Sequence, residues 1–368
     1  MFSLLPHSDV IAVERAIADY RAGRPVVIAD GDQTILALGI EGVDVDMATT
    51  LEKFAGGRAR LVLPSARLRR LGCERSGPGA IALPTIDMSR MERLALHVDA
   101  RVDAPVAPAV KLDEVAVELA ALSYVLPAVI VVPLAEVGPI DPSLVRVDAT
   151  SILGYRRAKL RDLRIVGRAP VPLEGAPDTE FVVFRGGEGL RDHVAIVIGR
   201  PDFNEPVPMR IHSACLTGDL FGSLKCDCGD QLRDTAQGMA REGGGIILYL
   251  DQEGRGNGIA NKMRAYKLQS QGFDTYDADE VLGFDLDQRR FDFAAEMLKQ
   301  LGVQRVRVMT NNPQKIGALK RAGLDVASDQ RVLGRPTAEN VRYLASKRDR
   351  AGHIIDFEAL AARAQSKD

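Results

Sequence analysis

The sequence predicts an α/β protein of two domains, each a mixed sheet with packed helices, and three observations support this prediction. The chain has 368 residues, which suits two domains of ordinary size. Short apolar runs typical of strands alternate along it with longer helical patterns. Residues 166–177 hold three prolines and two glycines, which is typical of a linker or of the entry to a new domain. We therefore place the boundary near residue 160, between domains at 1–160 and 161–368.

The first domain is expected to open with a helix from about Asp9 to Arg21, because its apolar residues recur at helical spacing. The break Gly23-Arg24-Pro25 ends that helix. The other elements expected in this domain are strands at Val26–Ile28, Ala59–Leu63 and Ala128–Val132 and a short helix at Ser151–Lys159.

The second domain shows the same alternation. Its expected strands are Glu180–Arg185, His193–Ile198, Val207–Ile211, Gly245–Leu250 and Val306–Thr310. Its expected helices are Cys228–Glu242, Asn257–Gln271, Gln288–Leu301, Pro313–Ala322 and Thr337–Ala351. This pattern predicts a second mixed α/β domain.

Composition excludes several classes of function. With 48 Lys and Arg against 50 Asp and Glu, the net charge is −2, whereas a general nucleic-acid binder is basic overall. Aromatic residues make up only 5% of the chain, which argues against a surface that stacks single-stranded bases. The N-terminal residues lack the pattern of a signal peptide. The longest uncharged stretch, Leu119–Ala135, is interrupted by Pro127 and Pro133 and is too short to span a bilayer. We expect a cytoplasmic protein with no membrane or nucleic-acid partner.

Three of the four cysteines form the pattern C-x10-C-x-C, at Cys215, Cys226 and Cys228. Sulfur ligands suit Zn²⁺, and three protein ligands leave a fourth position for water, as in catalytic zinc sites. Two other interpretations stay open: a structural site with His212 as the fourth ligand, and three unrelated buried cysteines. The fourth thiol, Cys73, lies in the other domain and is expected to be inert and buried.

Two polar turns are candidate anion sites. Residues 251–259, Asp-Gln-Glu-Gly-Arg-Gly-Asn-Gly-Ile, connect a strand to a helix, where backbone N–H groups point outward at the helix N-terminus. Arg255 within this turn is a bidentate donor suited to phosphate. Thr310-Asn-Asn-Pro-Gln-Lys is a second turn of this kind, at the end of a strand and the start of a helix. A cation such as Lys315 is unfavourable in the first turn of a helix, and a nearby anionic ligand would explain it. A simple tight turn and an exposed lysine are the alternatives.

Several longer motifs resemble the GTP cyclohydrolase II family. They occur in the order that the family has and cover roughly residues 165–353. They are Arg210-Ile-His-Ser-Ala-Cys-Leu-Thr-Gly-Asp, Cys226-Asp-Cys-Gly-Asp-Gln-Leu, Gln252-Glu-Gly-Arg-Gly, Asn261-Lys-Met-Arg-Ala-Tyr-Lys-Leu-Gln, Leu282-Gly-Phe-Asp-Leu-Asp-Gln-Arg and Thr310-Asn-Asn-Pro-Gln-Lys.

The resemblance implies a hydrolase that opens the imidazole ring of GTP in the first step of riboflavin synthesis. The reaction releases formate and pyrophosphate and leaves a diaminopyrimidinone ribosyl phosphate. The resemblance also implies one Zn²⁺ per chain on Cys215, Cys226 and Cys228, Mg²⁺ with the GTP phosphates, and a homodimer. The implied GTP contacts are Arg210, His212, Ser213, Gln231, Glu253, Gly254, Arg255, Thr275, Thr310 and Lys315.

Three further residues have catalytic roles by the same resemblance. Tyr266 would act at the opened ring, and it shares a helix face with Lys262 at i, i+4 spacing. Asp287 would be the proton acceptor. Arg289 would attack the α-phosphate, and because its pKa is far above neutral, a charge clamp on that phosphate is the alternative.

The chain departs from the family at three positions. Ala214 stands where the family usually has Glu, and Asp251 and Asn257 stand where it often has Arg and an aliphatic residue. The loss of a carboxylate beside the expected metal leaves room for an altered substrate. The catalytic positions are all filled, so we expect an active enzyme.

The first domain resembles 3,4-dihydroxy-2-butanone 4-phosphate synthase. The resemblance rests on Val13-Glu-Arg-Ala-Ile-Ala-Asp-Tyr-Arg-Ala-Gly-Arg-Pro-Val-Val-Ile, Leu126-Pro-Ala-Val-Ile-Val-Val and a helix ending Gly154-Tyr-Arg-Arg. The acidic loop of that family is replaced by Asp30-Gly-Asp-Gln-Thr-Ile-Leu-Ala, which lacks the carboxylates of a Mg²⁺ site for a sugar phosphate. We expect a degenerate, non-catalytic domain that serves dimerisation or stability.

Two other functions stay open. One is a ring-opening hydrolase that acts on another nucleotide or stops at a formylated product. The other is a nucleotide-binding regulatory protein with structural zinc, which would use a fourth protein ligand and would not need Asp287 and Arg289 together. Release of formate from GTP distinguishes these functions.

Overall fold

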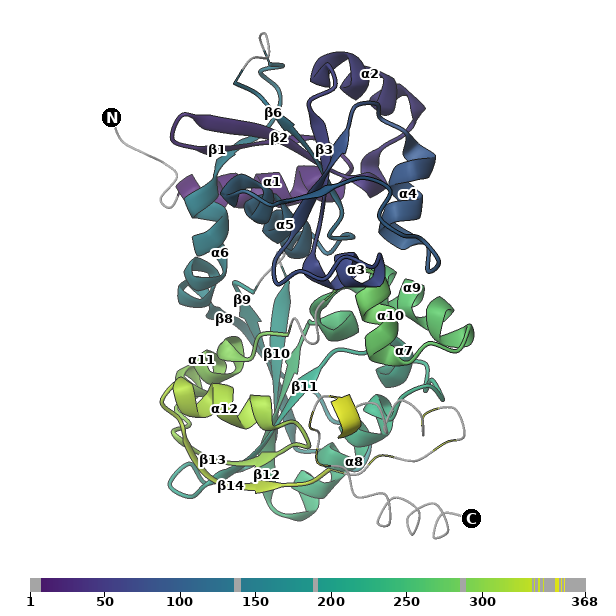
Figure 1. Ribbon diagram of the computed structural model, residues 1–368. Coiled ribbons are helices and arrows are strands. Elements are labelled where there is room, and N and C mark those ends of the chain that lie inside the picture. The colour runs from purple at the N-terminus through teal and green to yellow at the C-terminus, as the bar shows by residue number, and fades with distance from the viewer. Residues whose placement is uncertain are drawn as a thin grey trace, which may run out of the picture. The chain divides into compact units, whose positions relative to one another are not determined.

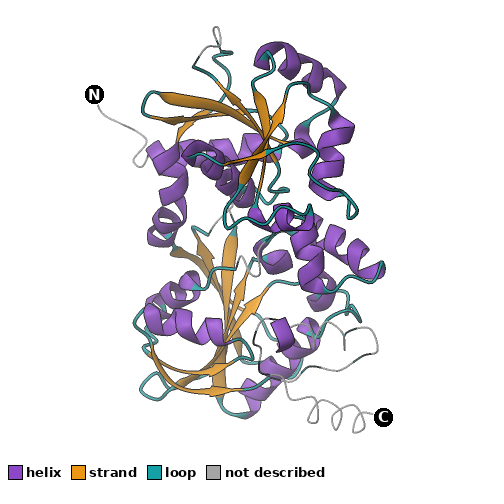
Figure 2. Cartoon of the chain, in the orientation of Figure 1, coloured by secondary structure: helices purple, strands orange, loops and turns teal. Residues whose placement is uncertain are grey.

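The computed structural model describes residues 8–135, 140–187, 191–284, 289–332 and 348–350, together with residues 334, 337, 340, 352 and 354. Within these residues the chain packs as two compact units. The first unit contains the chain up to Lys159, Asn257–Phe273 and the described part of Asp277–Gln288. The second contains Leu160–Gly256, Asp274–Tyr276 and the described residues from Arg289 onward. Each unit has one sheet of seven strands with helices packed against it (Figure 1 and Figure 2).

The sheet of the first unit has the strand order β5-β4-β3-β6-β2-β1-β7. Its strands are β1 Val26–Asp30, β2 Gln33–Gly39, β3 Ala59–Leu63, β4 Gly79–Leu83, β5 Val106–Pro108, β6 Val129–Pro133 and β7 Arg146–Asp148. The N-terminal helices are α1 Ser8–Arg21, α2 Val45–Ala55, α3 Ser65–Arg70, α4 Met88–Leu96, α5 Lys111–Leu122 and α6 Ala149–Asp162. Neighbouring strands are antiparallel except for the parallel pair β1–β7, so the sheet is mixed.

Helices cover both faces of this first sheet. Because successive strand residues point to opposite faces, Ile28 and Ile35 pack with α1, α5 and α6, while Val27 and Leu36 pack with α2, α3 and α4. Two later helices, α9 (Ile259–Ser270) and the C-terminal part of α10 (Thr275–Val281), join the same unit through a separate apolar cluster.

The sheet of the second unit has the order β14-β13-β11-β12-β10-β9-β8. Its strands are β8 Arg164–Pro170, β9 Thr179–Arg185, β10 Asp192–Gly199, β11 Val207–Ser213, β12 Gly244–Leu250, β13 Arg305–Met309 and β14 Asp325–Gln330. Its helices include α7 Leu216–Asp219, α8 Cys228–Arg241, α11 Asp292–Gln300 and α12 Pro313–Arg321. Strands β14, β13, β11 and β12 are parallel, and β10, β9 and β8 extend the sheet in antiparallel fashion.

The topology of this second sheet determines where a ligand can bind. Ile246 and Leu248 of β12 pack with α11 and α12 on one face, and Ile247 packs with α8 on the other. Strands β12 and β13 lie on opposite sides of β11, so the strand order reverses there. In sheets of this kind ligands bind outside the carboxyl ends of the strands at such a reversal.

The predicted fold class is confirmed, and so are most of the predicted elements, with small shifts at their ends. Residues 166–177 were predicted as a linker or as the entry to a new domain, and their first part is not a linker, because Arg164–Pro170 forms β8 of the second sheet. As an exposed edge strand, β8 tolerates the proline that ends it. Cys73 is half-buried against an apolar cluster, where full burial was expected. Most of the helix expected at Thr337–Ala351 lies outside the described residues. None of the described helices combines the length and apolar composition that a membrane span requires.

Candidate metal centre and anion site

The carboxyl ends of three parallel strands bring together segments that are distant in sequence. Strand β11 leads to Cys215, β12 leads to the turn Glu253–Gly256, and β13 leads to Lys315 on α12. The Ala214 N–H donates to the carbonyl of Leu250 (2.8 Å), which holds the first two strand ends together. The predicted metal ligands and two of the predicted anion-binding segments therefore share one edge of the sheet.

The thiols of Cys215, Cys226 and Cys228 converge. Their sulfur atoms lie within 4.8 Å of one another, and the sulfurs of Cys215 and Cys226 are 3.6 Å apart. Gly218 permits this approach, because a Cβ at that position would lie 2.7 Å from the Cys226 sulfur and 3.1 Å from the Cys215 sulfur. This convergence contradicts the interpretation as three unrelated buried cysteines.

The surroundings of the thiols favour a bound cation. The neighbouring Cys215 thiol and, to a smaller extent, burial raise the pKa of Cys226 to about 11. The thiols of Cys215 and Cys226 raise the pKa of Cys228 well above its ordinary value. Three sulfur donors are a ligand set that Zn²⁺ prefers, and a cation among them stabilises the deprotonated form. Cys228 also begins α8, whose N-terminal dipole favours negative charge. The donor set therefore fits a zinc ion.

Asp219 ties the first cysteine to two aromatic side chains. One carboxylate oxygen accepts from the Cys215 backbone N–H (2.9 Å) and from the Tyr249 hydroxyl (3.0 Å). The other lies 3.0 Å from Nε2 of His212, whose ring stacks on that of Tyr249 with centroids 5.5 Å apart. Burial lowers the pKa of His212, so the neutral ring donates its Nε2–H to Asp219.

His212 is thus bonded to Asp219 through Nε2. Among the described residues, the group of possible metal ligands contains the three thiols and not His212. The geometry therefore does not favour His212 as a fourth ligand of a closed structural site.

A chain of polar side chains, buried at both ends and half-buried at Gln231, links the loop of the thiols to β11. The Arg210 guanidinium donates to Gln231 Oε1, and the Gln231 amide donates to Asp227 Oδ2, each at 2.5 Å. Asp227 stands between Cys226 and Cys228 in sequence. Burial lowers the pKa of Arg210, and within the described part of the chain its Nε has no hydrogen-bond partner. A buried guanidinium with an unsatisfied N–H suits an anionic ligand.

Two further cations lie around one aromatic ring. The Lys315 ammonium is 5.4 Å from the ring centroid of Phe291, and the Arg289 guanidinium is 5.5 Å from it. Lys315 is buried and donates to the carbonyl of Ile211 (2.7 Å), so the alternative of an exposed lysine is wrong. Two positive charges at one ring suit a polyanion such as a triphosphate.

The turn after β12 has an unusual backbone and one buried carboxylate. Gly254 and Arg255 have φ of 62° and 60°, a left-handed pair that is costly for arginine. The two carboxylate oxygens of Glu253 accept the backbone N–H groups of Leu216 (2.6 Å) and Gly254 (2.9 Å). The Arg255 guanidinium lies 4.2 Å from the ring centroid of Tyr276. Glu253 therefore links this turn to the residue that follows Cys215.

Three hydroxyl residues complete the predicted contacts in the second unit. Thr310 is buried, and its hydroxyl accepts the N–H of Asn312 (3.0 Å) at the start of α12. Ser213 is half-buried at the end of β11, and Thr275 is buried at the first residue of α10.

The other predicted catalytic residues lie elsewhere in the chain. Tyr266 is on α9, in the first unit, and the Lys262 ammonium lies 5.5 Å from its ring centroid, which confirms that the two side chains share a helix face. Asp287 lies outside the described residues.

Two of the residues that depart from the family motifs, Asp251 and Asn257, contact other residues of the chain. Asp251 forms an ion pair with Arg191 (2.7 Å), and its N–H donates to Nδ1 of His193 (3.2 Å). Asn257 is buried, and its carbonyl accepts from the side-chain amide of Asn261 (2.9 Å). Both residues therefore have structural contacts in this chain.

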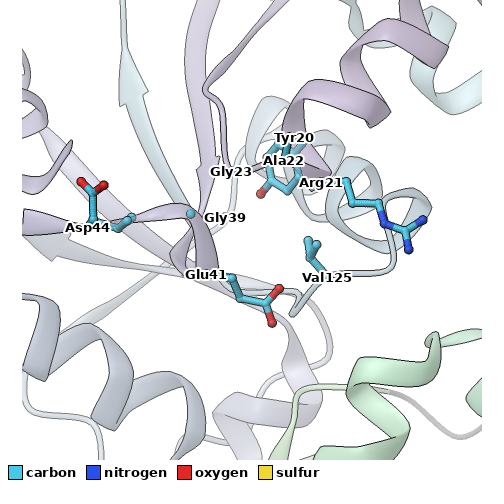
Figure 3. A pocket seen from close by; sticks show the side chains of 10 residues that line it. Tyr20, Arg21, Ala22, Gly23, Gly39, Glu41, Asp44 and Val125 are labelled. Atoms are coloured by element: carbon cyan, nitrogen blue, oxygen red, sulfur yellow. The ribbon is translucent and has the colours of Figure 1, made fainter. Parts of the chain in front are cut away.

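Each of the two units contains a cavity. One, of about 460 Å³, is in the second unit and is mostly apolar, with the ring of Tyr249 in its wall. The other, of about 390 Å³, is in the first unit and is lined by residues that include Tyr20, Glu41 and Val125 (Figure 3). No predicted site residue lines either cavity.

Three residues that organise the site had no role assigned from the sequence. Gly218 and Asp219 stand in the motif Cys215-Leu-Thr-Gly-Asp, where a glycine and a carboxylate close behind a cysteine indicate a site without giving their contacts. Tyr249 had no such signal, because only the pairing of β11 with β12 places it opposite His212.

Comparison with known proteins gives the following similarities. The family model described as GTP cyclohydrolase II matches residues 164–331. A relative named GTP cyclohydrolase-2, from Xylella fastidiosa, is 41% identical over 364 residues, which cover 96% of this chain and 90% of the relative. A relative of the same name from Azospirillum brasilense is 39% identical, with 94% of each chain covered.

The chain is also similar to two proteins with other names. A relative named Riboflavin biosynthesis protein RibBA, from Salinispora arenicola, is 41% identical over 60% of this chain and 52% of its own. The crystal structure of RibBX, described as a two domain 3,4-dihydroxy-2-butanone 4-phosphate synthase from A. baumannii, matches with a TM-score of 0.33 and 15% identity. That match covers 88% of this chain and 99% of the other.

Proposed function

Because this chain belongs to the GTP cyclohydrolase II family, a family of hydrolases in riboflavin biosynthesis, we propose that it opens the imidazole ring of GTP by zinc-dependent hydrolysis, releasing formate and pyrophosphate. One observation carries the proposal: three thiols that suit zinc lie at the same sheet edge as the segments of the buried cations Arg210 and Lys315. Ring opening at a base and loss of pyrophosphate require a metal centre and a phosphate site together.

At the ring end, Cys215, Cys226 and Cys228 would hold the zinc ion, with water in the fourth position. A bound Zn²⁺ would lower the pKa of water to near neutrality and so make a nucleophile available at pH 7. Asp219 fixes the Cys215 backbone, and Glu253 fixes the next residue in the chain, so the first ligand is held from both sides.

Proton transfer at the ring end would use two residues whose roles are inferred from the family. The hydroxyl of Tyr266 would donate to charge that develops on the opening ring, and Asp287 would accept a proton. Each Glu253 oxygen accepts one backbone N–H, and a carboxylate has further acceptor capacity for the amino and ring N–H groups of guanine.

At the phosphate end, the charges of Arg210, Arg255, Arg289 and Lys315 would neutralise the triphosphate, with Mg²⁺ bound to the phosphates. Arg289 would act at the α-phosphate, as nucleophile or as charge clamp. Its guanidinium packs against the ring of Phe291, as does the Lys315 ammonium. Ser213, Gln231, His212, Gly254, Thr275 and Thr310 would complete the nucleotide contacts.

The deciding experiment is the assay of formate and pyrophosphate from GTP with zinc-loaded protein and Mg²⁺. We expect the two products in equal amounts. Other purine nucleotides are the comparators, because Ala214 stands beside the first cysteine and leaves room for a different substrate. Release of formate from another nucleotide but not from GTP would show that the substrate is that other nucleotide. Binding of GTP without release of formate would favour a regulatory protein.

We propose further that the active form is a homodimer, as in the family. Sedimentation equilibrium with and without the zinc ion tests this assembly, and a monomer at assay concentration with full activity would contradict it.

A further inference from the structure

A segment that lies within the match to the GTP cyclohydrolase II family packs largely in the first unit. It runs from Asn257 to Phe284 and contains α9, which carries Tyr266, and α10, which begins at Thr275. The chain continues from it directly to Asp287. Three residues with family roles in the reaction therefore lie on this segment or just after it, and the contacts that hold the segment matter for the site.

Helix α3 in the N-terminal domain carries arginines that bind α10. Arg70 forms ion pairs with both Asp277 and Glu280, and Arg69 forms a pair with Glu280 (3.4 Å). Arg70 and Glu280 are 210 residues apart in the chain. These side chains are half-buried and share their partners, so they form a network that is stronger than an isolated exposed pair.

Arg67, on the same helix, is among the largest fully buried side chains. Its guanidinium donates to the carbonyls of Val281 (2.9 Å), Leu94 (2.7 Å) and His97 (2.7 Å). Val281 ends α10 and Leu94 lies in the last turn of α4, so one cation satisfies the carbonyls of two helix ends. Burial and the charge of Arg70 lower the pKa of Arg67 to about 10, which leaves it charged at neutral pH.

Helix α9 is held by two polar contacts and by an apolar cluster. Arg264 forms an ion pair with Glu41, which also lines the cavity of Figure 3, and the Asn261 amide donates to the carbonyl of Tyr124 (3.3 Å). Tyr266 is two residues from Arg264, so its position depends on these contacts. The buried residues of the cluster are Leu126, Ala265, Leu268, Ala278, Val281, Leu282 and Phe284.

We propose that the N-terminal domain positions helices α9 and α10, with Arg67, Arg70 and Glu41 as positioning residues for Tyr266. The proposal rests on the proposed function, because the role of Tyr266 comes from the family. A domain with this task needs no catalytic groups of its own.

The turn that replaces the acidic loop of the synthase agrees with a domain of this kind. It joins β1 to β2 as a tight hairpin, with Asp30 paired to Gln33. The Asp30 carboxylate forms an ion pair with Lys111 (2.6 Å). Asp30 thus has a partner within the domain.

The test compares two arginine substitutions in the full chain. Arg70→Ala removes the ion pairs to α10. The matched control Arg90→Ala removes a bidentate pair with Asp103 (2.9 Å for both bonds), which does not involve the segment 257–284. Both arginines are partly exposed in the same domain, so we expect both variants to fold. The measurements are zinc content, kcat and KM for formate release from GTP, and hydrogen exchange of the amides of residues 259–284.

We expect Arg70→Ala to lower kcat by about 10-fold or more with a smaller change in KM, since a displacement of about 1 Å can cost on the order of 10²-fold. Amide exchange in residues 277–284 should become faster, zinc content should stay full, and Arg70→Lys should recover part of the rate. Arg90→Ala should stay within about twofold of the wild type.

A second arm tests the link to Tyr266. Glu41→Gln removes the charged partner of Arg264 and should lower kcat in the wild-type chain. In a Tyr266→Phe background it should cost little more, because residues that act as a unit are not additive. Equal losses in both backgrounds would overturn Glu41 as a positioning residue for Tyr266.

Other outcomes also decide against the proposal. Unchanged exchange and kcat in Arg70→Ala, faster exchange with no fall in kcat, or an equal loss in Arg90→Ala would each overturn it. A wild-type chain that releases no formate from GTP would instead refute the proposed function, and the exchange comparison would still show whether Arg70 holds α10.

Discussion

The substitution Gly218→Ala tests whether the three cysteines form one metal site. Gly218 is not among the residues with positive φ, so the added methyl acts through its volume. Its Cβ would lie 2.7 Å from the Cys226 sulfur, 3.1 Å from the Cys215 sulfur and 3.2 Å from the Cβ of Cys228. A single methyl group therefore meets all three predicted zinc ligands.

The size of the effect follows from these distances. An ordinary contact of a methyl carbon is about 3.6 Å, so the Cys226 sulfur must move by about 1 Å. Zinc–sulfur bonds are about 2.3 Å long, and sites hold their ligands to about 0.2 Å. The displacement exceeds this tolerance several-fold. We expect zinc affinity to fall by about 10- to 100-fold or more, and overpacking to lower the free energy of unfolding by about 1–3 kcal/mol.

The assay is zinc content after gel filtration against a competing chelator, together with formate release from GTP. The matched control is Gly238→Ala on α8, where an added Cβ would have only the Arg241 guanidinium at 4.0 Å. That change should leave zinc and activity intact and stabilise the helix by about 0.5–1 kcal/mol. Wild-type zinc affinity in a folded Gly218→Ala protein would refute the reasoning, because the thiols would then tolerate a misplacement that a tetrahedral zinc site cannot.

Three further outcomes are expected. Cys226→Ser should lose bound zinc and activity while the sheet stays folded, and metal analysis that finds a full complement would contradict the ligand assignment. Tyr266→Phe should lower formate release by about 10²–10⁴-fold while pyrophosphate release persists. If quantification of both products shows equal losses, with zinc intact, the hydroxyl is not confined to the ring step. Burial lowers the pKa of His193 from 6.5 to about 4, so below pH 6.5 the unfolded chain binds more protons than the folded one. This difference should lower the free energy of unfolding by about 2 kcal/mol between pH 7 and pH 5. Urea unfolding at both pH values should show a smaller decrease for His193→Asn, and an equal decrease would show that His193 is not responsible.

Local patterns in the sequence were sufficient for much of the fold. Helical spacing predicted α1, and apolar runs predicted β3 and β12, because each reflects which side chains one element buries. The hairpin strand β2 and the short helices α3, α7 and α10 were not predicted. Elements of this length have weak periodicity and form largely through tertiary packing.

The chemistry of the site was predictable because it depends on the types of its residues. The thiols of Cys215, Cys226 and Cys228 have few roles at this spacing other than metal binding, and their convergence agrees with that interpretation. The contacts around them were not predictable. Asp219 and Tyr249 reach Cys215 and His212 only when α7 turns back at the end of β11 and β12 pairs with that strand.

By itself, the sequence determined the fold class, the family and the residue types of a candidate metal and nucleotide site, since these depend on composition, spacing and motifs. Only the tertiary structure decided which parts of the chain pack together. A boundary near residue 160 follows the linear order of the chain, whereas α9 and the end of α10 pack with the N-terminal domain. The physical reason is that Arg67 and Arg70 look like ordinary surface charges in sequence, and only the fold brings them to the end of a helix some 210 residues away.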